Sequence, residues 1–341
     1  MFKFGKTITP KDIIVVDDLK DFKSKTLAVA ISPQRTPSLD RVRSDILQAI
    51  KPLGFKTTFV DVSDIALVNF DYKLFVSSFL RSAVSFNYYC AFASKNIDYL
   101  VVEGYTDISA DEHWFDNHVV FTPSEFSQFC MNRSGVKTQV IPHGVNPDVF
   151  FETKTDKTVD IFTICPNVSR KGYDQFIQVI KRIKSRLDIK VHIHSPYGVK
   201  KDDVYVTTND FDDATLRNLY SSAKLYVLPS LVEGFGMTPL EAMACGCAVV
   251  TLNAPAMNEY MPEKFMIKTV DVVWKSYEAN PELTFPLHMP DMEHYEQLIF
   301  DILTIKDVYQ ENRALMKEVL KNYYTIKHYT ALFADYVVLR A

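Results

Sequence analysis

The chain has 341 residues, a formal net charge of −4 at pH 7, and a composition of 47% hydrophobic and 23% charged residues. These values are typical of a folded globular protein and exclude a disordered or membrane-spanning chain. The length exceeds what one hydrophobic core usually supports, so we expect two domains, and the acidic balance without a basic tract excludes nucleic acid as the expected partner.

The cysteines and the first residues indicate a compartment. Five cysteines are odd in number and lack CxxC spacing, which favours buried free thiols in a reducing cytoplasm: Cys90, Cys130, Cys165, Cys245 and Cys247. The N-terminal sequence MFKFGKTITPKD lacks the apolar core of a secretion signal, and no apolar run reaches the length that crosses a bilayer. We therefore expect a cytoplasmic protein, and a peripheral contact with a membrane is left open.

The first half of the chain alternates between strand-like and helix-like patterns. We expect strands at residues 26–31, 56–61, 99–102 and 118–121, an amphipathic helix at 39–51, and a helix with an aromatic side at 74–94. The polar segment 152–158 that follows is typical of a linker.

A second alternating series begins after the linker. We expect strands at 160–165 and 190–194 and helices at 173–186 and 214–222, followed by a further strand–loop–helix–strand unit. Two such series predict an α/β protein of two doubly wound, Rossmann-like domains with a cleft between them. We place these domains at residues 1–151 and 152–319.

The most informative segment is residues 225–252, LYVLPSLVEGFGMTPLEAMACGCAVVTL. A buried strand should end at Leu228, and a glycine-containing loop at 233–236 should lead into a helix with Thr238 as N-cap and Pro239 as its first residue. The helix should end at Gly246, before a second buried strand. Such a unit directs backbone amides and a positive helix end at the carboxyl edge of a parallel sheet, where ligand phosphates are held.

Two glutamates lie beside this expected anion site. Glu241 follows Thr238 by three residues and can close a capping box, a role that does not exclude a ligand contact through its other carboxylate oxygen. Glu233 lies in the loop and has no cap to serve. A phosphate would repel this carboxylate, whereas sugar hydroxyls suit it as an acceptor.

Four segments in order carry a family resemblance. The Glu233–seven residues–Glu241 motif, together with segments 121–126, 140–150 and 169–174, resembles the retaining family 4 glycosyltransferases of the GT-B fold. The resemblance is specific from about residue 119 to 262. It implies transfer of a hexose from a UDP- or GDP-linked sugar to a glycan, lipid or protein acceptor, without a cofactor, and a last helix at about 320–341 that packs back on the first domain.

The resemblance also implies roles for individual residues. The expected catalytic residues are Glu233, Lys171 and Arg170, with the two cations neutralising the leaving diphosphate. The expected nucleotide-sugar-binding set is Glu241, Gly234, Phe235, Gly236, Met237, Thr238, Asn209 and Phe211. No carboxylate is placed as a nucleophile, so we expect attack on the face from which the leaving group departs.

We expect no metal ion at this site. Asp210 and Asp212 form an Asp-x-Asp triplet of the kind that holds a metal in other folds, but the acids also precede a helix near Ala214, and we interpret them as N-terminal helix charges. His192 and His194 alternate on one strand, and we interpret them as strand residues that lack a third ligand.

The sequence departs from the family pattern at three places. Cys165 lies where the family usually has a second Arg, which leaves Arg170 to share that role or Asn167 to hydrogen-bond instead. On the acceptor side, the usual His is absent after the fourth strand, and Glu103, Tyr105 and His113 are the candidates. The first loop, at 32–37, lacks paired glycines, and Arg35 is a candidate cation there.

Two other classes of protein stay open on sequence alone. A nucleotide-sugar epimerase of the same fold would release nucleotide without an acceptor. A catalytically silent nucleotide-sugar-binding subunit would bind the donor and turn nothing over. The sequence does not identify the sugar, the base, the acceptor or the oligomeric state.

Overall fold

The computed structural model describes residues 25–31, 37–61, 70–78, 96–106, 118–133, 135–166, 168–195, 204–208, 211–277 and 280–323, together with Thr325 and Tyr329. The chain divides into two compact units. The first unit comprises Met1–Gly144, Ser276–Thr284 and Thr325–Ala341, and the second comprises Val145–Lys275 and Phe285–Tyr324. The second unit thus begins at Val145, whereas the sequence analysis places the domain boundary after residue 151.

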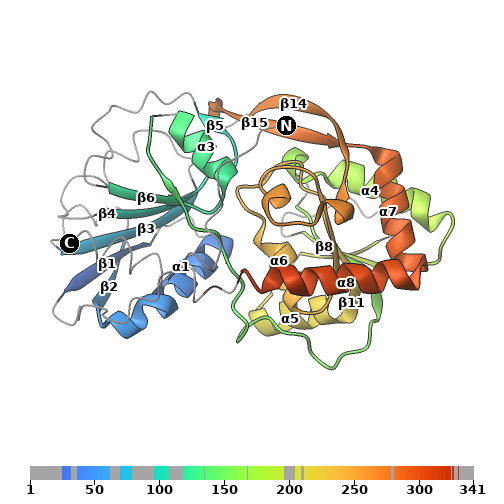
Figure 1. The fold of residues 1–341 in the computed structure, drawn as a ribbon, viewed down its shortest axis with the longest axis horizontal. Helices are drawn as coiled ribbons and strands as arrows, with labels where there is room; N and C mark the ends of the chain where they lie inside the picture. Colours follow the sequence, from blue (N-terminus) through green and yellow to red (C-terminus); the bar gives the residue numbers. More distant parts are fainter. Residues whose placement is uncertain are drawn as a thin grey trace. The chain divides into compact units, whose positions relative to one another are not determined.

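The first unit is built on a parallel sheet with strand order β2-β1-β3-β4-β6-β7 (Figure 1). The strands are β1 (Thr26–Ile31), β2 (Lys56–Asp61), β3 (Tyr72–Ser78), β4 (Asn96–Val101), β6 (His118–Thr122) and β7 (Gln139–Val140). The described helices are α1 (Pro37–Ile50), the short 3-10 helix η2 (Lys51–Leu53) and α3 (Glu125–Arg133). Consecutive parallel strands in this order form a doubly wound sheet.

Strand β3 corrects one prediction. We expected a helix from residue 74, but Tyr72–Ser78 is a strand paired with β1 on one side and β4 on the other. Residues 72–76 are buried without a polar face, because a central strand of a parallel sheet is covered on both faces. The aromatic spacing that suggested a helix extends into residues 79–94, which lie outside the described residues.

Three buried rings meet in the first unit. The His143 Nδ1 atom lies 3.1 Å from the Tyr99 hydroxyl and 3.0 Å from the Tyr329 hydroxyl. Burial lowers the pKa of His143 to about 3, so its imidazole is neutral at pH 7. Tyr329 belongs to the segment that we expected to return as a final helix. The rest of that segment beyond residue 323, apart from Thr325, lies outside the described residues.

The second unit is built on a parallel sheet with strand order β10-β9-β8-β11-β12-β13. Its strands are β8 (Val159–Ile164), β9 (Val191–His194), β10 (Tyr205–Thr207), β11 (Ala223–Leu228), β12 (Ala248–Leu252) and β13 (Met266–Ile267). Its helices are η4 (Ser169–Lys171), α4 (Tyr173–Lys184), α5 (Asp213–Ser222), α6 (Met237–Ala244), η5 (Met257–Glu259), η6 (Glu263–Phe265), α7 (Met292–Thr304) and α8 (Lys306–Leu320). Helix α4 packs on α7, and α6 packs on α5 and α8 (Figure 1).

Strands β11 and β12 form the centre of the second unit's core. Except for Lys224, their residues are buried, as expected for apolar strands covered on both faces. Beside β12, the buried Asn312 of α8 accepts a hydrogen bond from the Val249 N–H at 2.8 Å and donates one to the Val249 carbonyl at 2.9 Å. Its side-chain amide thus pairs with β12 as a neighbouring strand would. The prediction of two doubly wound α/β domains is confirmed.

A third, smaller sheet has the order β14-β15-β5. Its strands are β14 (Thr269–Tyr277), β15 (Asn280–Pro290) and β5 (Tyr105–Thr106), and β15 runs antiparallel to β5. The sequence analysis did not predict this sheet.

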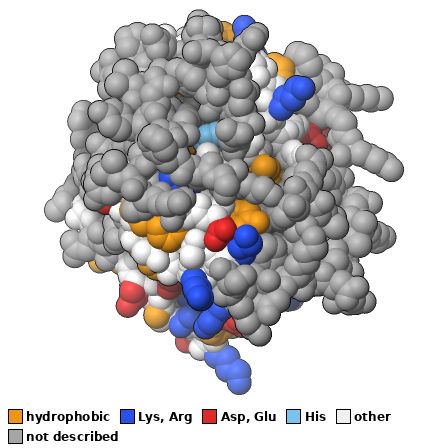
Figure 2. Space-filling model, turned by 90° about the vertical axis from the view of Figure 1, so that its left-hand side faces the viewer, with side chains coloured by type: hydrophobic (Ala, Val, Ile, Leu, Met, Phe, Trp, Pro, Cys, Tyr) orange, Lys and Arg blue, Asp and Glu red, His pale blue; other side chains and the backbone are white. Residues whose placement is uncertain are grey.

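In the part of the chain that the structure describes, no helix is both long and apolar enough to span a bilayer. Acidic, basic and apolar side chains are interspersed on the face drawn in Figure 2. Four of the five cysteines are described, and all four are buried free thiols, as predicted.

Candidate functional site

The candidate site lies at the carboxyl ends of two neighbouring parallel strands. Strand β8 leads to η4, which contains Arg170 and Lys171, and β11 leads to the loop that contains Glu233. Since β8 and β11 are paired in the sheet, the segments that follow them emerge at the same edge. In doubly wound proteins this edge is where ligands bind.

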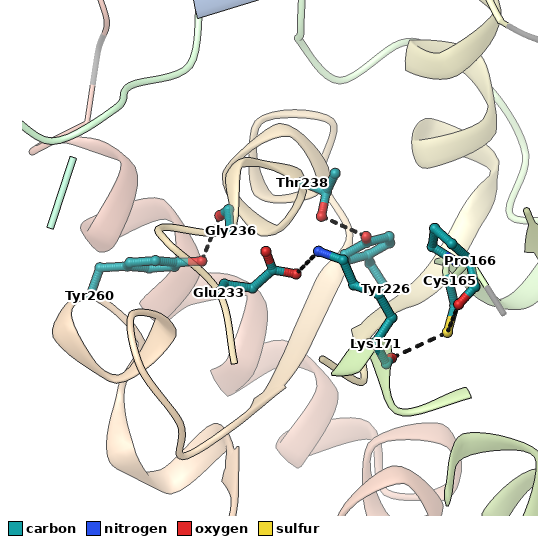
Figure 3. A network of polar contacts seen from close by, with 8 residues as sticks. All are labelled: Cys165, Pro166, Lys171, Tyr226, Glu233, Gly236, Thr238 and Tyr260. Carbon is teal, nitrogen blue, oxygen red and sulfur yellow. Dashed lines mark hydrogen bonds and ion pairs between the residues drawn. The ribbon is translucent and has the colours of Figure 1, made fainter. Parts of the chain in front are cut away.

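An ion pair joins the two segments. The Lys171 Nζ atom donates a hydrogen bond to Glu233 Oε1 at 2.5 Å, and the two side chains point toward each other (Figure 3). Their side chains are 18% and 9% exposed, so the pair is largely removed from water. Two residues 62 positions apart, which the sequence analysis named separately as candidate catalytic residues, are therefore brought together.

The charges near Glu233 keep this carboxyl ionised. Burial alone would raise the pKa of Glu233, but the positive charges of Lys171 and Arg170, with hydrogen bonds from Lys171 and Ser230, outweigh burial and lower the pKa below its ordinary value. At neutral pH Glu233 is an anion between two cations. These three side chains together carry one net positive charge, which suits an anionic ligand.

Backbone hydrogen bonds fix the Arg170–Lys171 turn and the Glu233 loop relative to their neighbours. The Leu231 N–H donates to the Arg170 carbonyl at 2.9 Å, and the Glu233 N–H donates to the Pro255 carbonyl at 2.8 Å. Gly172 has φ +68°, and a Cβ atom there would lie 2.0 Å from the Pro229 carbonyl oxygen. A side chain at position 172 would therefore push the Lys171 turn away from the Glu233 loop.

The start of α6 corrects the predicted capping box. The helix begins at Met237 with Gly236 as N-cap, and no side chain caps it. Thr238 is inside the first turn, where its Oγ1 accepts from the Tyr226 hydroxyl at 2.7 Å (Figure 3). The prediction of Thr238 as N-cap is wrong because Gly236, at φ +83°, turns the chain into the helix two residues earlier.

Glu241 is buried on α6 and points toward α5 rather than to the helix start. Its Oε2 accepts from the Tyr220 hydroxyl at 2.9 Å, and the residue is 4% exposed. The structure therefore gives Glu241 a hydrogen-bond partner in the core. The predicted helix end is confirmed, since Gly246 follows α6 with φ +78° and its N–H donates to the Met243 carbonyl.

Aromatic rings pack behind the glycine loop. Phe235 is buried against Tyr260 and Tyr323, with ring centroids 5.2 and 6.2 Å away. The Tyr260 hydroxyl donates to the Gly236 carbonyl at 2.8 Å (Figure 3). Phe235 thus anchors the loop with its side chain. Gly236, Met237 and Thr238 are partly exposed, as is Phe211 of the same expected donor-binding set.

The two histidines of β9 are core residues, as the sequence analysis interpreted them. The His192 Nε2 and His194 Nδ1 atoms lie 2.9 and 3.3 Å from the Thr207 hydroxyl. Burial, with a smaller contribution from His194, lowers the pKa of His192 to about 4. Phe211, an expected donor-side residue, places its ring 4.4 Å from that of His194.

Asp212 has the helix-terminal role that the sequence predicted. It is the N-cap of α5, and its side chain accepts from the Thr215 N–H at 2.7 Å. Its neighbour Asp210 lies outside the described residues, as do four further candidates: Asn209, Asn167, Arg35 and His113.

The described acceptor-side candidates lie in the first unit. Tyr105 opens β5 and packs its ring against Phe126 and Phe129 of α3, with the Arg133 guanidinium 5.4 Å from its centroid. Burial and the neighbouring Cys130 raise the pKa of Tyr105 to about 12, while Arg133 opposes the shift. Glu103 is partly buried two residues earlier.

Cys165 occupies the position where the family resemblance led us to look for an Arg. Its Sγ lies 3.4 Å from the Lys171 carbonyl oxygen, and burial raises the pKa of the thiol to about 12. The thiol is therefore neutral and packs beneath the Lys171 turn. The sequence reasoning missed the tyrosines that support the site, Tyr220, Tyr226 and Tyr260, although Tyr226 at the end of an apolar strand was a visible signal.

Comparisons with known proteins bear on the family and the fold of the chain. Residues 160–273 match the family model Glycosyl transferases group 1. The serotype-specific mannosyltransferase WbdA of Escherichia coli is 29% identical over 129 residues, which are 38% of this chain and 13% of that protein. The chain thus matches only a small part of the length of this relative.

Solved structures resemble the whole chain. A glycosyltransferase of Rickettsia africae superposes with a TM-score of 0.68 at 14% identity, covering 92% of this chain and 97% of the other. HepE of Anabaena, solved in complex with UDP and glucose, superposes with a TM-score of 0.64 at 11% identity, covering 92% and 99%. The chain therefore has the GT-B fold, and its residues 160–273 are similar to the group 1 glycosyl transferases.

Proposed function

We propose that this GT-B protein is a retaining glycosyltransferase that moves a hexose from a nucleoside-diphosphate sugar to a glycan, lipid or protein acceptor. The observation that carries the proposal is the buried Lys171–Glu233 pair beside Arg170, at the carboxyl edge of the second unit's sheet. This arrangement offers both groups that sugar transfer requires. Cations can meet a leaving diphosphate, and a fixed carboxylate can accept hydroxyl groups of a sugar.

Lys171 and Arg170 are assigned to the diphosphate. Negative charge grows on the leaving phosphate as the anomeric bond breaks, and prepositioned cations stabilise that charge without reorganising. The amides at the start of α6, in residues 236–238, add a positive helix end to the same site. We infer that these groups neutralise the leaving group without a metal ion.

Glu233 is assigned to the sugar. A carboxylate has about four acceptor positions on its two oxygens, so pairing with Lys171 through Oε1 is compatible with accepting sugar hydroxyls as well. Its lowered pKa keeps it in the acceptor-only form at neutral pH. In this role Glu233 orients the donor, and the acceptor attacks the face from which the diphosphate leaves, with a donor phosphate oxygen taking the acceptor's proton.

The donor identity is proposed as a UDP- or GDP-linked hexose. HepE was solved with UDP and glucose, and WbdA is named as a mannosyltransferase. Both names are compatible with a hexosyl donor and leave the base open. The expected location is the cytoplasm, with a peripheral contact at a membrane where the acceptor is a lipid.

The test is a panel of UDP- and GDP-linked hexoses, scored for nucleotide release with and without candidate acceptors, with mass spectrometry of the products. Glu233→Gln should lose most transfer activity in a folded protein, and Lys171→Ala should lower kcat roughly a hundredfold or more. Lys264→Ala is the matched control, because Lys264 forms an equally short but exposed ion pair with Glu311.

Other outcomes of the panel would favour a different function. Nucleotide release that needs no acceptor would favour an epimerase, and donor binding without any turnover would favour a silent subunit. Activity should survive an excess of chelator. If chelation abolishes activity and manganese restores it, the Asp210–Asp212 pair becomes the better candidate, as the ligands of a metal ion that neutralises the leaving diphosphate.

A further inference from the structure

Strand β15 contacts the candidate site although it lies outside the parallel sheet that forms the site. It pairs with β14 and β5 in the third sheet. It also lies beyond residue 273, where the match to the family model ends. The contacts that β15 makes with the site thus come from outside the matched region.

The first contact is a stacking contact with one of the two cations. The Arg170 guanidinium carbon lies 5.8 Å from the centroid of the Phe285 ring, within the range in which a cation is attracted to an aromatic face. Phe285 is 4% exposed, so the ring is fixed in the core. A fixed ring restricts the rotamers of an arginine, which otherwise has many.

The second contact runs through the backbone. The His288 N–H of β15 donates to the Leu231 carbonyl at 3.0 Å, and the Leu231 N–H donates to the Arg170 carbonyl at 2.9 Å. Leu231 therefore bridges β15 and the cation turn. A third contact comes from the neighbouring strand, where the Lys275 Nζ atom donates to Ser169 Oγ at 3.3 Å.

These contacts converge on Arg170 from two directions. The backbone bridge fixes where the Arg170 main chain lies, and the Phe285 ring fixes where its guanidinium lies. Lys171, the residue after Arg170, pairs with Glu233, so the turn that carries Arg170 borders the candidate site. The positive charge of Arg170 also helps to lower the pKa of Glu233, so it acts within electrostatic range of that carboxylate. Phe285 thus contacts a proposed phosphate-binding cation through its aromatic ring.

We propose that Phe285 is a positioning residue, which holds the Arg170 guanidinium toward the terminal phosphate of a nucleoside-diphosphate ligand. The inference rests on the proposed function for the identity of that ligand. Phe285 acts through Arg170 and touches no reacting atom. Its removal should lower affinity for nucleoside diphosphates and leave affinity for nucleoside monophosphates, which lack the terminal phosphate.

The test is calorimetry of the full-length protein with UDP, GDP, UMP and GMP. Phe285→Leu keeps an apolar side chain in the core but removes the ring, and Phe285→Tyr keeps the ring. We expect Phe285→Leu to weaken diphosphate binding roughly fivefold to thirtyfold, which corresponds to about 1–2 kcal/mol at 1.4 kcal/mol per factor of ten. Monophosphate binding should change less than twofold, and Phe285→Tyr should stay within twofold of the wild type for both.

A double-mutant cycle and a matched control make the test specific. In an Arg170→Gln background, Phe285→Leu should have no further effect on diphosphate affinity, because the group it positions is gone. Phe300→Leu is the control, since Phe300 stacks on Arg186 at 4.0 Å, beyond the far end of α4, which is about 18 Å long. It should leave both affinities unchanged.

The outcomes separate this inference from the proposed function. If the wild type binds nucleoside diphosphates and Phe285→Leu binds them equally well, the positioning role is overturned and the proposed function stands. An equal loss of diphosphate and monophosphate affinity also overturns it, since that loss signals general damage to the site. If the wild type binds neither UDP nor GDP, the proposed function fails and this inference fails with it.

Discussion

Removing one partner of the Lys171–Glu233 pair should lower the free energy of unfolding of the second unit at neutral pH. Lys171→Met removes the ammonium and leaves a buried carboxylate, a change that costs about 3–5 kcal/mol when no other cation is near. Because Arg170 still lies near Glu233, we expect the lower end, about 3 kcal/mol. Glu233→Gln leaves an ammonium that is 18% exposed, and we expect it to cost about 1–2 kcal/mol.

The double variant should be far less damaging than the sum of the two. Lys171→Met with Glu233→Gln leaves no unpaired charge, so we expect a cost close to that of Glu233→Gln alone and a coupling energy of about 3 kcal/mol. The assay is urea unfolding at pH 7, fitted with one transition for each unit. Additive single-variant costs would refute the reasoning, because they would mean that the two side chains do not pair in solution.

The same pair predicts a pH dependence with a defined sign. The pKa of Glu233 is lower in the folded protein than in the unfolded chain, so its stabilising contribution is present above about pH 4.5 and is lost as the pH falls through the folded value. In Lys171→Met the main lowering cation is gone and burial raises the pKa of Glu233. The cost of the variant should therefore shrink between pH 7 and pH 5, where the carboxyl takes up a proton.

Three further predictions address the core around the site and the first unit. Asn312→Leu should destabilise the second unit by about 2–4 kcal/mol in urea unfolding, because both backbone groups of Val249 lose their partner. Tyr220→Phe should cost about 1.5–3 kcal/mol in the same assay by removing the donor to the buried Glu241 carboxylate, and wild-type stability would contradict that bond. The pKa of His143 falls to about 3 on folding, so its contribution to stability is full above about pH 6.5 and is lost as the pH drops. We expect the first unit's free energy of unfolding to fall by about 2 kcal/mol between pH 7 and pH 5 for this reason. His143→Phe should remove that part of the pH dependence.

Strand and helix positions followed from sequence wherever the apolar period was clear. In the second unit, the predicted strand at 160–165 is β8 at Val159–Ile164, and the predicted helix at 173–186 is α4 at Tyr173–Lys184. Strand β3 was missed because its apolar residues are continuous rather than alternating, a pattern that a buried helix shares. Its pairing with β1 and β4 depends on residues far along the chain, which periodicity does not report.

The site was predictable in its charges and not in its contacts. Family resemblance selected Glu233, Lys171 and Arg170, and the structure brings these three together. The capping assignment failed because the spacing of Thr238 and Glu241 fits a capping box locally, whereas Tyr226 and Tyr220 offer each side chain a buried partner. Tertiary hydrogen bonds of this kind leave no mark in a local spacing rule.

The pairing of Glu233 with Lys171 also changes how the site should be understood. The sequence analysis assigned one residue to the sugar and the other to the phosphate, as if they acted separately. A buried ion pair makes them one unit, since the charge of Lys171 helps to keep Glu233 ionised and the carboxylate holds the ammonium in place. An incoming diphosphate competes with Glu233 for Lys171, and the proposed donor therefore weakens the ion pair as its own phosphate contact forms. Because Arg170 stays near the carboxylate, it compensates part of the Glu233 charge while Lys171 turns to the phosphate.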